Sequence, residues 1–156
     1  MPLHIELLAD HTEFIPRIAW LYEQEWGSYR PGETLEQKGE RIRSICGRGT
    51  VPTAVVAMDG TELRGSAFLI RSDLVSRPDL TPWLGGVYVL AEYRRRGIGS
   101  VLTEHVESLA KLNGVSKLYL FTDKTESLYA RLGWAPFERT THKGKAIVIM
   151  AKSLAD

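Results

Sequence analysis

The chain has 156 residues, of which 44% are hydrophobic and 25% charged, the composition of an ordinary soluble globular protein. A formal net charge of +1 gives no overall field that would attract nucleic acid or an anionic membrane, so any positive charge that matters must be local. No apolar run approaches the roughly 20 residues of a membrane helix, the start does not resemble a signal peptide, and the single cysteine, Cys46, cannot form an internal disulfide, which fits a reducing cytoplasm.

The first third of the chain predicts a strand and two helices. Residues 4–10 (HIELLAD) alternate as a strand does. Residues 12–26 carry apolar side chains at helical spacing, and Thr12 is the expected N-cap. Residues 34–47 predict a shorter amphipathic helix that ends at Gly47.

The middle of the chain predicts a hairpin, a strand and a long helix. Two β-rich runs in residues 52–72 are joined around Asp59-Gly60, a strong hairpin signal. Residues 83–90 (WLGGVYVL) predict the next strand. A helix then follows a glycine turn and ends near Gly114. We expect one face of this helix to be apolar and to consist of Val101, Leu102, His105, Val106, Leu109 and Leu112.

The last third predicts a strand at 117–123, a short helix at 126–134 and a final strand at 144–154. The predicted order is therefore β-α-α-β-β-β-α-β-α-β, with no linker or repeat. Helices that fall between the strands of one sheet indicate an α/β sandwich whose central sheet is mixed and flanked by helices. We expect residues 1–156 to form a single domain.

Residues 94–100 (RRRGIGS) join a predicted strand to a predicted helix. The first backbone N–H groups of a helix have no partners, and the aligned peptide dipoles add partial positive charge there. Gly97 and Gly99 have no Cβ, so an anion can approach the backbone closely. Three arginines add multidentate donors for phosphate oxygens: Arg94, Arg95 and Arg96. The turn therefore predicts a phosphate ligand, and we expect a pyrophosphate.

Three other interpretations of this turn compete with a pyrophosphate site. A Walker A loop fails because no Gly-Lys-Ser/Thr follows. A dinucleotide fingerprint fits Gly97, Gly99 and the later Asp123, but Leu102 stands where the third glycine belongs. A solvated surface turn, in which the glycines serve only the backbone geometry, is the third alternative and stays open.

Residues 87–102 (VYVLAEYRRRGIGSVL) resemble the acetyl-coenzyme A binding motif of the GNAT superfamily of N-acetyltransferases, Arg/Gln-x-x-Gly-x-Gly/Ala. Downstream, residues 127–134 (SLYARLGW) resemble the second signature of that family, a tyrosine four residues before Gly-aromatic. The resemblance is sharp from about Trp83 to Pro136 and architectural before that. It implies the GNAT fold, with a mostly antiparallel sheet, and acetyl-coenzyme A as cosubstrate.

The resemblance also implies the residues that would bind the cosubstrate. Backbone amides of the turn would bind the pyrophosphate: Arg95, Arg96, Gly97, Ile98, Gly99 and Ser100, with Arg94 at the first motif position. A bulged strand would hydrogen-bond the pantetheine arm and the thioester through Val87, Tyr88 and Val89. A strand N–H around Tyr88 or Val89 would polarise the carbonyl.

Tyr129 is the expected catalytic residue. A tyrosine hydroxyl has a pKa near 10, above the roughly 8.5 of a simple thiol, so it stays protonated at neutral pH and can act as a general acid. The resemblance places this hydroxyl near the coenzyme sulfur, where it would protonate the departing thiolate. Without the resemblance, a half-buried packing role would be the simpler interpretation.

No general base is predicted on the strand before the turn. Many family members carry a glutamate there, whereas this chain has Trp83, Leu84, Gly85 and Gly86. The remaining candidates are Asp73, Glu25 and His142, acting directly or through water, and each also fits a solvated surface group.

The acceptor is expected to be an amine held by aromatic and acidic side chains. Residues 20–33 mix aromatic residues with glutamates, a combination that can hold a cation, although an amphipathic helix would show the same pattern. The expected acceptor contacts are Trp26, Tyr29 and Trp83.

The sequence therefore predicts an N-acetyltransferase that moves an acetyl group from acetyl-coenzyme A to a primary amine by direct attack in a ternary complex. The acceptor is a small-molecule or peptide amine. The alternatives are a non-catalytic acetyl-coenzyme A-binding or regulatory module and a nucleotide-binding domain. We expect no metal, because the histidines and the cysteine lack ligand spacing, and no nucleic-acid or membrane partner. Exposed edge strands of such a sheet allow a homodimer.

Overall fold

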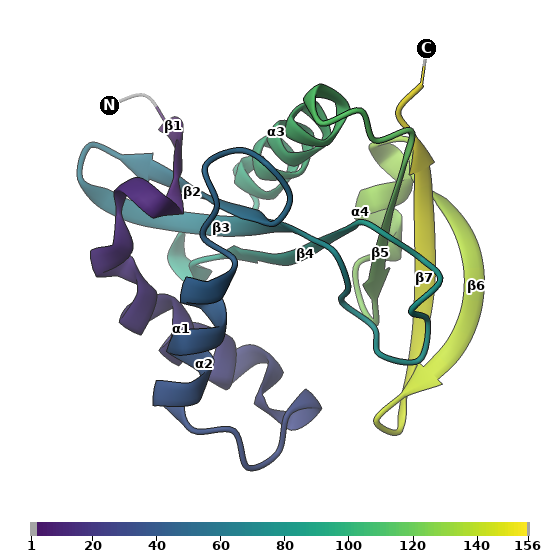
Figure 1. Ribbon diagram of the computed structural model, residues 1–156, viewed down its shortest axis with the longest axis horizontal. Coiled ribbons are helices and arrows are strands. Elements are labelled where there is room, and N and C mark those ends of the chain that lie inside the picture. Colours follow the sequence, from purple (N-terminus) through teal and green to yellow (C-terminus); the bar gives the residue numbers. More distant parts are fainter. Residues whose placement is uncertain (1–2, 156) are drawn as a thin grey trace.

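A seven-stranded sheet forms the middle of the molecule in the computed structural model, which describes residues 3–155 (Figure 1). The strands lie in the order β1-β2-β3-β4-β5-β7-β6. All neighbours run antiparallel except β4 and β5, which are parallel. The strands are β1 (Leu3–Leu7), β2 (Thr53–Asp59), β3 (Glu62–Ile70), β4 (Trp83–Val89), β5 (Lys117–Thr122), β6 (Ala135–His142) and β7 (Lys145–Ser153).

Helices cover both faces of this sheet. α1 (Ile15–Trp26) and α2 (Leu35–Ser44) pack against each other on one face. On the other face, α3 (Ile98–Leu112) packs against β2, β3 and β4, and α4 (Glu126–Arg131) lies beside β5 and β7 (Figure 1). Short 3₁₀ turns connect these elements: η1 (Leu8–Asp10), η2 (Thr12–Phe14), η3 (Gly27–Tyr29) and η4 (Ala91–Tyr93).

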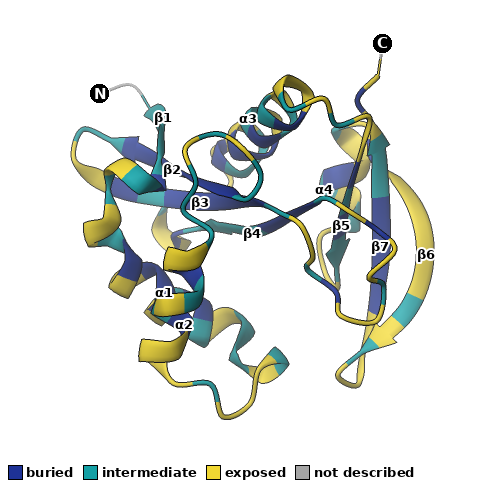
Figure 2. Ribbon diagram, in the orientation of Figure 1, coloured by how far each residue is buried: buried dark blue, intermediate teal, exposed yellow. Residues whose placement is uncertain are grey.

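The alternation of side chains along the strands divides the core between the two faces. In β2, Val55 and Ala57 join the cluster under α3, whereas Val56 and Met58 join the cluster under α1 and α2. Both sets are buried, so β2 is dark along most of its length in Figure 2. A third cluster, around Trp83, fills the region between β4, β5 and β7.

β4 and β5 pair over a very short distance and then separate. The only bridge between them joins Trp83 to Tyr119. Toward the end of β4 the two strands diverge, and the gap between them faces the turn that leads into α3 (Figure 1). A parallel pair that opens in this way leaves backbone hydrogen-bonding groups of both strands without a strand partner.

Most predicted elements are confirmed, and several details are corrected. The first strand ends at Leu7, and the helix predicted from Thr12 begins at Ile15, because residues 12–14 form a 3₁₀ turn in which Thr12 caps nothing. The strand β6 was not predicted. Its first five residues are exposed and include a proline, as in a loop, and only its pairing with β7 defines it as a strand.

The buried face of α3 also differs from the predicted one. The buried residues are Ile98, Leu102, Thr103, Val106 and Ala110. Val101 and Leu112 are exposed and His105 is half-buried. The predicted apolar face therefore included residues that lie on the solvent side of the helix.

Candidate functional site

A bulge in β4 marks the point where the gap opens. Gly85 pairs with Phe68 and Tyr88 pairs with Ser66, so two residues of β4, Gly86 and Val87, lie opposite a single residue of β3. Gly86 has φ +58°, and a Cβ there would lie 2.7 Å from the Phe68 ring and 2.8 Å from the Tyr22 hydroxyl. Only glycine fits this position.

Two buried hydroxyls hold the bulge in place. The Tyr22 hydroxyl donates to the Gly86 carbonyl at 2.5 Å, and the Ser66 hydroxyl lies 3.1 Å from the same oxygen. Tyr22 and Ser66 are also in hydrogen-bond contact with each other. Burial raises the pKa of Tyr22, so this hydroxyl stays neutral and acts as a fixed donor. No local sequence pattern indicates this pair, because its two residues are 44 positions apart.

Beyond the bulge, β4 presents a free backbone donor to the gap. Leu90 donates its N–H to the Arg64 carbonyl at 3.0 Å, toward β3. Because successive residues of a strand point to opposite edges, the N–H of Val89 points toward the gap. The Val89 carbonyl, which shares that edge, accepts a hydrogen bond from Arg94 Nε at 2.8 Å. The Val89 N–H is therefore directed away from β3, and its role in polarising a carbonyl stays a prediction.

The arginine–glycine turn, residues 94–100, ends in an uncapped helix. Arg95 and Gly97 have left-handed backbone angles, φ +66° and +82°. Gly97 is the N-cap of α3 and supplies no side chain to cap it, so the first N–H groups, of Ile98, Gly99 and Ser100, lack intrahelical partners. A Cβ on Gly97 would meet no atom within 4 Å, so the space above these donors is open. The arrangement fits a phosphate group.

The three arginines of the turn do different work. The Arg94 side chain folds back onto the end of β4, where it binds the Val89 carbonyl, lies 3.6 Å from the Glu25 carboxylate and packs over the Tyr88 ring. Arg95 and Arg96 are exposed, and within residues 3–155 neither has a carboxylate partner. These two side chains are therefore the ones available to an anion.

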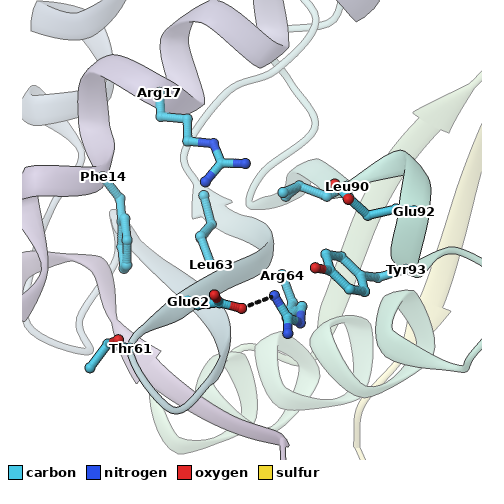
Figure 3. A pocket seen from close by; sticks show the side chains of 9 residues that line it. All are labelled: Phe14, Arg17, Thr61, Glu62, Leu63, Arg64, Leu90, Glu92 and Tyr93. Atoms are coloured by element: carbon cyan, nitrogen blue, oxygen red, sulfur yellow. Dashed lines mark ion pairs between the residues drawn. The ribbon is translucent and has the colours of Figure 1, made fainter.

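A pocket of about 280 Å³ lies behind the turn, between η4, the β2–β3 hairpin and the start of α1 (Figure 3). Inside it, the Arg64 guanidinium stacks on the Tyr93 ring, 3.8 Å from its centroid, and pairs with Glu62 at 3.0 Å. Arg96 lies over the same ring at 5.6 Å. Because Tyr93 directly precedes the turn, these contacts attach the turn to the hairpin, which supports a structural role for the pocket.

Tyr129 lies in the core cluster on the α3 side of the sheet. Its ring packs edge-on against Trp134, with 6.2 Å between centroids, among side chains from β4, β5 and α3. Its hydroxyl forms no hydrogen bond with any residue in the described part of the chain. Burial raises the pKa of Tyr129 to about 12, so the hydroxyl keeps its proton throughout the neutral range.

A polar network that sequence analysis missed fixes the segment after Tyr129. The Glu107 carboxylate of α3 accepts hydrogen bonds from Trp134 Nε1 at 3.0 Å and from Lys152 Nζ at 2.8 Å. Lys152 also donates to the Leu132 carbonyl at 2.7 Å, and the backbone N–H groups of Leu132 and Trp134 donate to the Tyr129 carbonyl, each at 3.0 Å. Tyr129 is therefore held by α3 and β7 together.

The three expected acceptor contacts lie in different surroundings. Trp83 has no exposed surface, and its Nε1 donates to the Leu80 carbonyl at 2.6 Å, which argues against contact with an acceptor. Trp26 is half-buried and packs edge-on against Tyr22 and Tyr88. Tyr29 stacks on His142 with 5.2 Å between ring centroids, so that η3 touches the β6–β7 hairpin.

The three candidates for a general base also lie in different surroundings. Glu25 pairs with Arg94. His142 is stacked on Tyr29, and burial lowers its pKa. Asp73 lies against β4, with Oδ2 at 3.1 Å from the position of a Cβ on Gly85.

Among residues 3–155, no group of three or more histidine, cysteine, aspartate or glutamate side chains is placed to hold a metal ion. In the same range, no helix is long and apolar enough to cross a membrane.

Comparison with known proteins agrees with this geometry. Residues 15–134 match the acetyltransferase (GNAT) family. No curated protein sequence matches the chain significantly.

Solved structures share the whole fold. The chain superposes over 99% of its length on all of an N-acetyltransferase from Staphylococcus aureus Mu50, with a TM-score of 0.78 and 15% identity. It superposes over its full length on 98% of an aminoglycoside 6'-N-acetyltransferase complexed with coenzyme A, with a TM-score of 0.74 and 17% identity. An aminoglycoside 6'-acetyltransferase type Ii gives a TM-score of 0.74 at 19% identity, with 100% of this chain and 99% of the other covered. The likeness in fold and the family match over most of the chain lead to one conclusion: the chain belongs to the GNAT family of acetyltransferases and is an acyltransferase.

Proposed function

We propose that the protein transfers an acetyl group from acetyl-coenzyme A to a primary amine by direct attack in a ternary complex. The observation that carries the proposal is the separation of β4 from β5 beyond a single bridge, together with the uncapped start of α3. The Tyr129 hydroxyl has no hydrogen-bond partner among residues 3–155, and its ring lies in the cluster on the α3 side of both strands. A donor with a phosphate at one end and a reactive carbonyl at the other matches these features.

The chain's own residues would bind and orient such a donor. The first N–H groups of α3 and the side chains of Arg95 and Arg96 would hold the pyrophosphate. The open edge of β4, at Val87 to Val89, would hydrogen-bond the pantetheine arm, with the Val89 N–H available to polarise the carbonyl. The bound cosubstrate supplies the activated acetyl group.

Tyr129 would supply the proton that the departing thiolate needs. A pKa of about 12 keeps its hydroxyl protonated, and it has no competing partner among the described residues. General acid catalysis of this kind contributes roughly 10²–10⁴-fold in rate.

The test is release of free thiol from acetyl-coenzyme A in the presence of an amine panel. Tyr129→Phe should lower kcat at least tenfold while calorimetry shows unchanged coenzyme A affinity. Tyr119→Phe is the matched control and should leave both kcat and coenzyme A affinity unchanged. Tyr119 is on β5 and packs against Trp83 of β4, away from the α3 side of the sheet. An unchanged kcat in Tyr129→Phe would remove this residue from the mechanism.

The same assay tests the alternative of a non-catalytic module, which Gly85 on β4 keeps open because it offers no side chain for base catalysis. Coenzyme A binding without turnover of any amine would favour that alternative. Tighter binding of NAD or ATP than of acetyl-coenzyme A would favour a nucleotide-binding domain.

A further inference from the structure

A second pocket, of about 240 Å³, lies on the α1–α2 side of the sheet, opposite α3. α2, the end of β3 and the loop after β3 form its walls. Its charged lining consists of Arg30, Arg41, Arg71 and Asp73. Its size suits a molecule about as large as an amino acid.

Asp73 occupies the place that a side chain on β4 would fill. Its Oδ2 lies 3.1 Å from the position of a Cβ on Gly85, where the side chain of Ile70 also approaches to 3.1 Å. Leu84 packs in the cluster under α3, so Gly85, its neighbour on the strand, faces the opposite side. The Asp73 carboxylate therefore lies one residue before the bulge at Gly86, across the sheet from Tyr129.

The carboxylate of Asp73 is free to act on a ligand. Within residues 3–155 it forms no hydrogen bond or ion pair. The groups around it are Tyr22 from α1, Arg41 from α2, and Arg30 and Arg71 from the adjoining loops. Burial raises the pKa of Asp73 to about 6, against the opposing effect of Arg30 and Arg41. A carboxylate with this pKa is ionised at pH 7 and still accepts a proton readily.

The arginines make the pocket positive overall. Arg41 is held by Glu33 through hydrogen bonds of 2.9 and 3.1 Å. Arg30 and Arg71 have no carboxylate partner in the described residues, although Arg71 donates to the Val51 carbonyl at 3.0 Å. Because Glu33 offsets the charge of Arg41, Arg30 and Arg71 leave a net positive charge beside the Asp73 carboxylate, which repels a polycation and attracts an acid.

We propose that this pocket receives the acceptor, that Asp73 takes the proton from its amine, and that Arg30 and Arg71 bind an acidic group on the same molecule. The acceptor class is then an amine that carries a carboxylate, such as an α-amino acid. This inference rests on the proposed acetyl transfer and names its substrate class.

The proposed step balances without any further reagent. The amine nitrogen forms a bond to the acetyl carbon, and the bond from that carbon to the coenzyme sulfur breaks. The amine proton passes to the Asp73 carboxylate, and the sulfur takes the proton of the Tyr129 hydroxyl. Asp73 then returns its proton to solvent and Tyr129 regains one, so the products are an amide and a free thiol.

Matched acceptors test the preference for an acid. Thiol release is measured with L-alanine, L-methionine, L-phenylalanine and L-glutamate, each beside its amino alcohol, and with spermidine and kanamycin as amines that lack an acidic group. At least one amino acid should exceed its alcohol and both polyamines at least tenfold in kcat/KM. Equal or better turnover of the alcohols or polyamines would overturn the inference and leave the proposed acetyl transfer intact.

Two arginine variants test the source of that preference. Arg30→Gln and Arg71→Gln should each raise KM for the preferred amino acid about tenfold and leave KM for its amino alcohol unchanged. Arg43→Gln is the control, because it removes the same charge from the exposed side of α2 without lining the pocket. Equal effects of all three variants would point to general electrostatics and contradict the site.

Asp73 is tested by a measurement that does not need turnover. In protein labelled with ¹³C at aspartate carboxyls, Asp73 is assigned by its absence in Asp73→Asn and should titrate near pH 6. The preferred amino acid should shift this signal when coenzyme A is bound. The kcat of Asp73→Asn should be about 100-fold lower than that of the wild type, and its kcat/KM should no longer rise with pH near pH 6. Asp73→Glu should recover part of the rate and part of the pH dependence.

The outcomes separate the two claims. If the amino acids bind at Asp73 and no amine is acetylated, the proposed function fails and the acid site stands. If amines are acetylated but no amino acid shifts the Asp73 signal, the inference fails. A pH profile of Asp73→Asn that keeps the rise near pH 6 also excludes Asp73 as the proton acceptor.

Discussion

Two glycines at the site have left-handed backbone angles for different reasons. At Gly86, φ is +58° and a Cβ would collide with Phe68 and the Tyr22 hydroxyl. At Gly97, φ is +82°, but a Cβ would meet nothing. Backbone strain acts at both positions, whereas steric exclusion acts only at Gly86.

Alanine at Gly86 should therefore reduce stability more than alanine at Gly97, whereas alanine at Gly97 should weaken coenzyme A binding. We expect Gly97→Ala to lower the free energy of unfolding by about 1–2 kcal/mol from strain alone, and Gly86→Ala to lower it by about 2–5 kcal/mol because overpacking adds to strain. Urea denaturation measures both. Gly97→Ala should nevertheless weaken coenzyme A binding, since its methyl group enters the space above the α3 donors. Equal losses of stability would contradict this assignment.

At the level of single residues, local sequence patterns name candidates for the donor side of the site more readily than for the acceptor side, and both sets stay predictions. The turn and Tyr129 follow from local spacing, so residues 94–100 and 129 could be named in advance. Trp83 was expected near the acceptor but is fully buried, because its aromatic character suits a core and a binding site equally well. Asp73 reaches β4 only through the path of a loop, which no local pattern predicts.

Among the elements, we expect the turn and α3 to act together in binding an anion. We expect the double variant Arg95→Gln/Arg96→Gln to weaken coenzyme A binding about tenfold or more, because two charge-assisted contacts to phosphate are lost. Calorimetry at two ionic strengths measures this. Added salt should weaken the wild-type protein more than the double variant.

Arg48→Gln is the control for that experiment, because Arg48 is exposed and pairs with Asp10 at 2.7 Å, away from the turn. Unchanged coenzyme A affinity in the double variant would favour the solvated-turn interpretation over a phosphate site.

α1 and α2 are joined by a partly buried ion network. Lys38 is 2% exposed and lies 2.6 Å from Glu33 and 3.7 Å from Glu23. The hydrogen bond from Arg41, with a further one from Lys38, lowers the pKa of Glu33 to about 2. The usual value is 4.5, so folding favours the ionised form of Glu33.

Glu33→Gln should destabilise the protein in a pH-dependent way. At about 1.4 kcal/mol per pKa unit, the change from 4.5 to about 2 corresponds to about 3.5 kcal/mol, and solvent screening lowers the expected loss at pH 7 to roughly 2–3 kcal/mol. The contribution of Glu33 is complete above pH 4.5 and disappears as the pH falls toward 2, so wild type and variant should converge in acid. Urea denaturation at pH 7 and pH 3 measures the difference. Glu36 is exposed on α2, so Glu36→Gln should lower the free energy of unfolding by only a few tenths of a kcal/mol. A loss in Glu36→Gln as large as that in Glu33→Gln would contradict a specific role of the ion network.

Which elements could be predicted depended on burial. The helices and the strands β2 to β5 carry their own apolar pattern and were found. β6 has almost no buried side chain, because it is an edge strand that packs on β7 alone. Its hydrogen bonds are supplied by a neighbour in space, and a pattern based on burial along one segment misses such a strand.

For the whole molecule, Trp83 is the side chain that joins the two halves of the sheet. It forms the only bridge between β4 and β5 and packs with Ile147 and Ile149 of β7. Trp83→Ala should therefore cost about 3–5 kcal/mol of unfolding free energy, with a smaller loss for Trp83→Phe, as measured by urea denaturation. Trp83→Phe should leave KM for the acceptor unchanged. A raised KM at full stability would restore Trp83 as an acceptor contact.

The order of the strands could not be read from the sequence in full. The hairpin β2–β3 follows from its turn, but the placement of β7 between β5 and β6 depends on long-range pairing. The same pairing brings β4 and β5 together in parallel and so creates the gap.

That gap gives the domain two strand edges inside its own sheet rather than at its rim. An exposed strand edge normally invites pairing with another chain, but here α3 and α4 lie on one face of these strands (Figure 1). A ligand that hydrogen-bonds to these strand edges in the native state alone raises the free energy of unfolding by RT ln(1 + [L]/Kd), where [L] is the free ligand concentration. Because coenzyme A is the molecule proposed to bind in this gap, we expect added coenzyme A to raise the resistance of the protein to thermolysin.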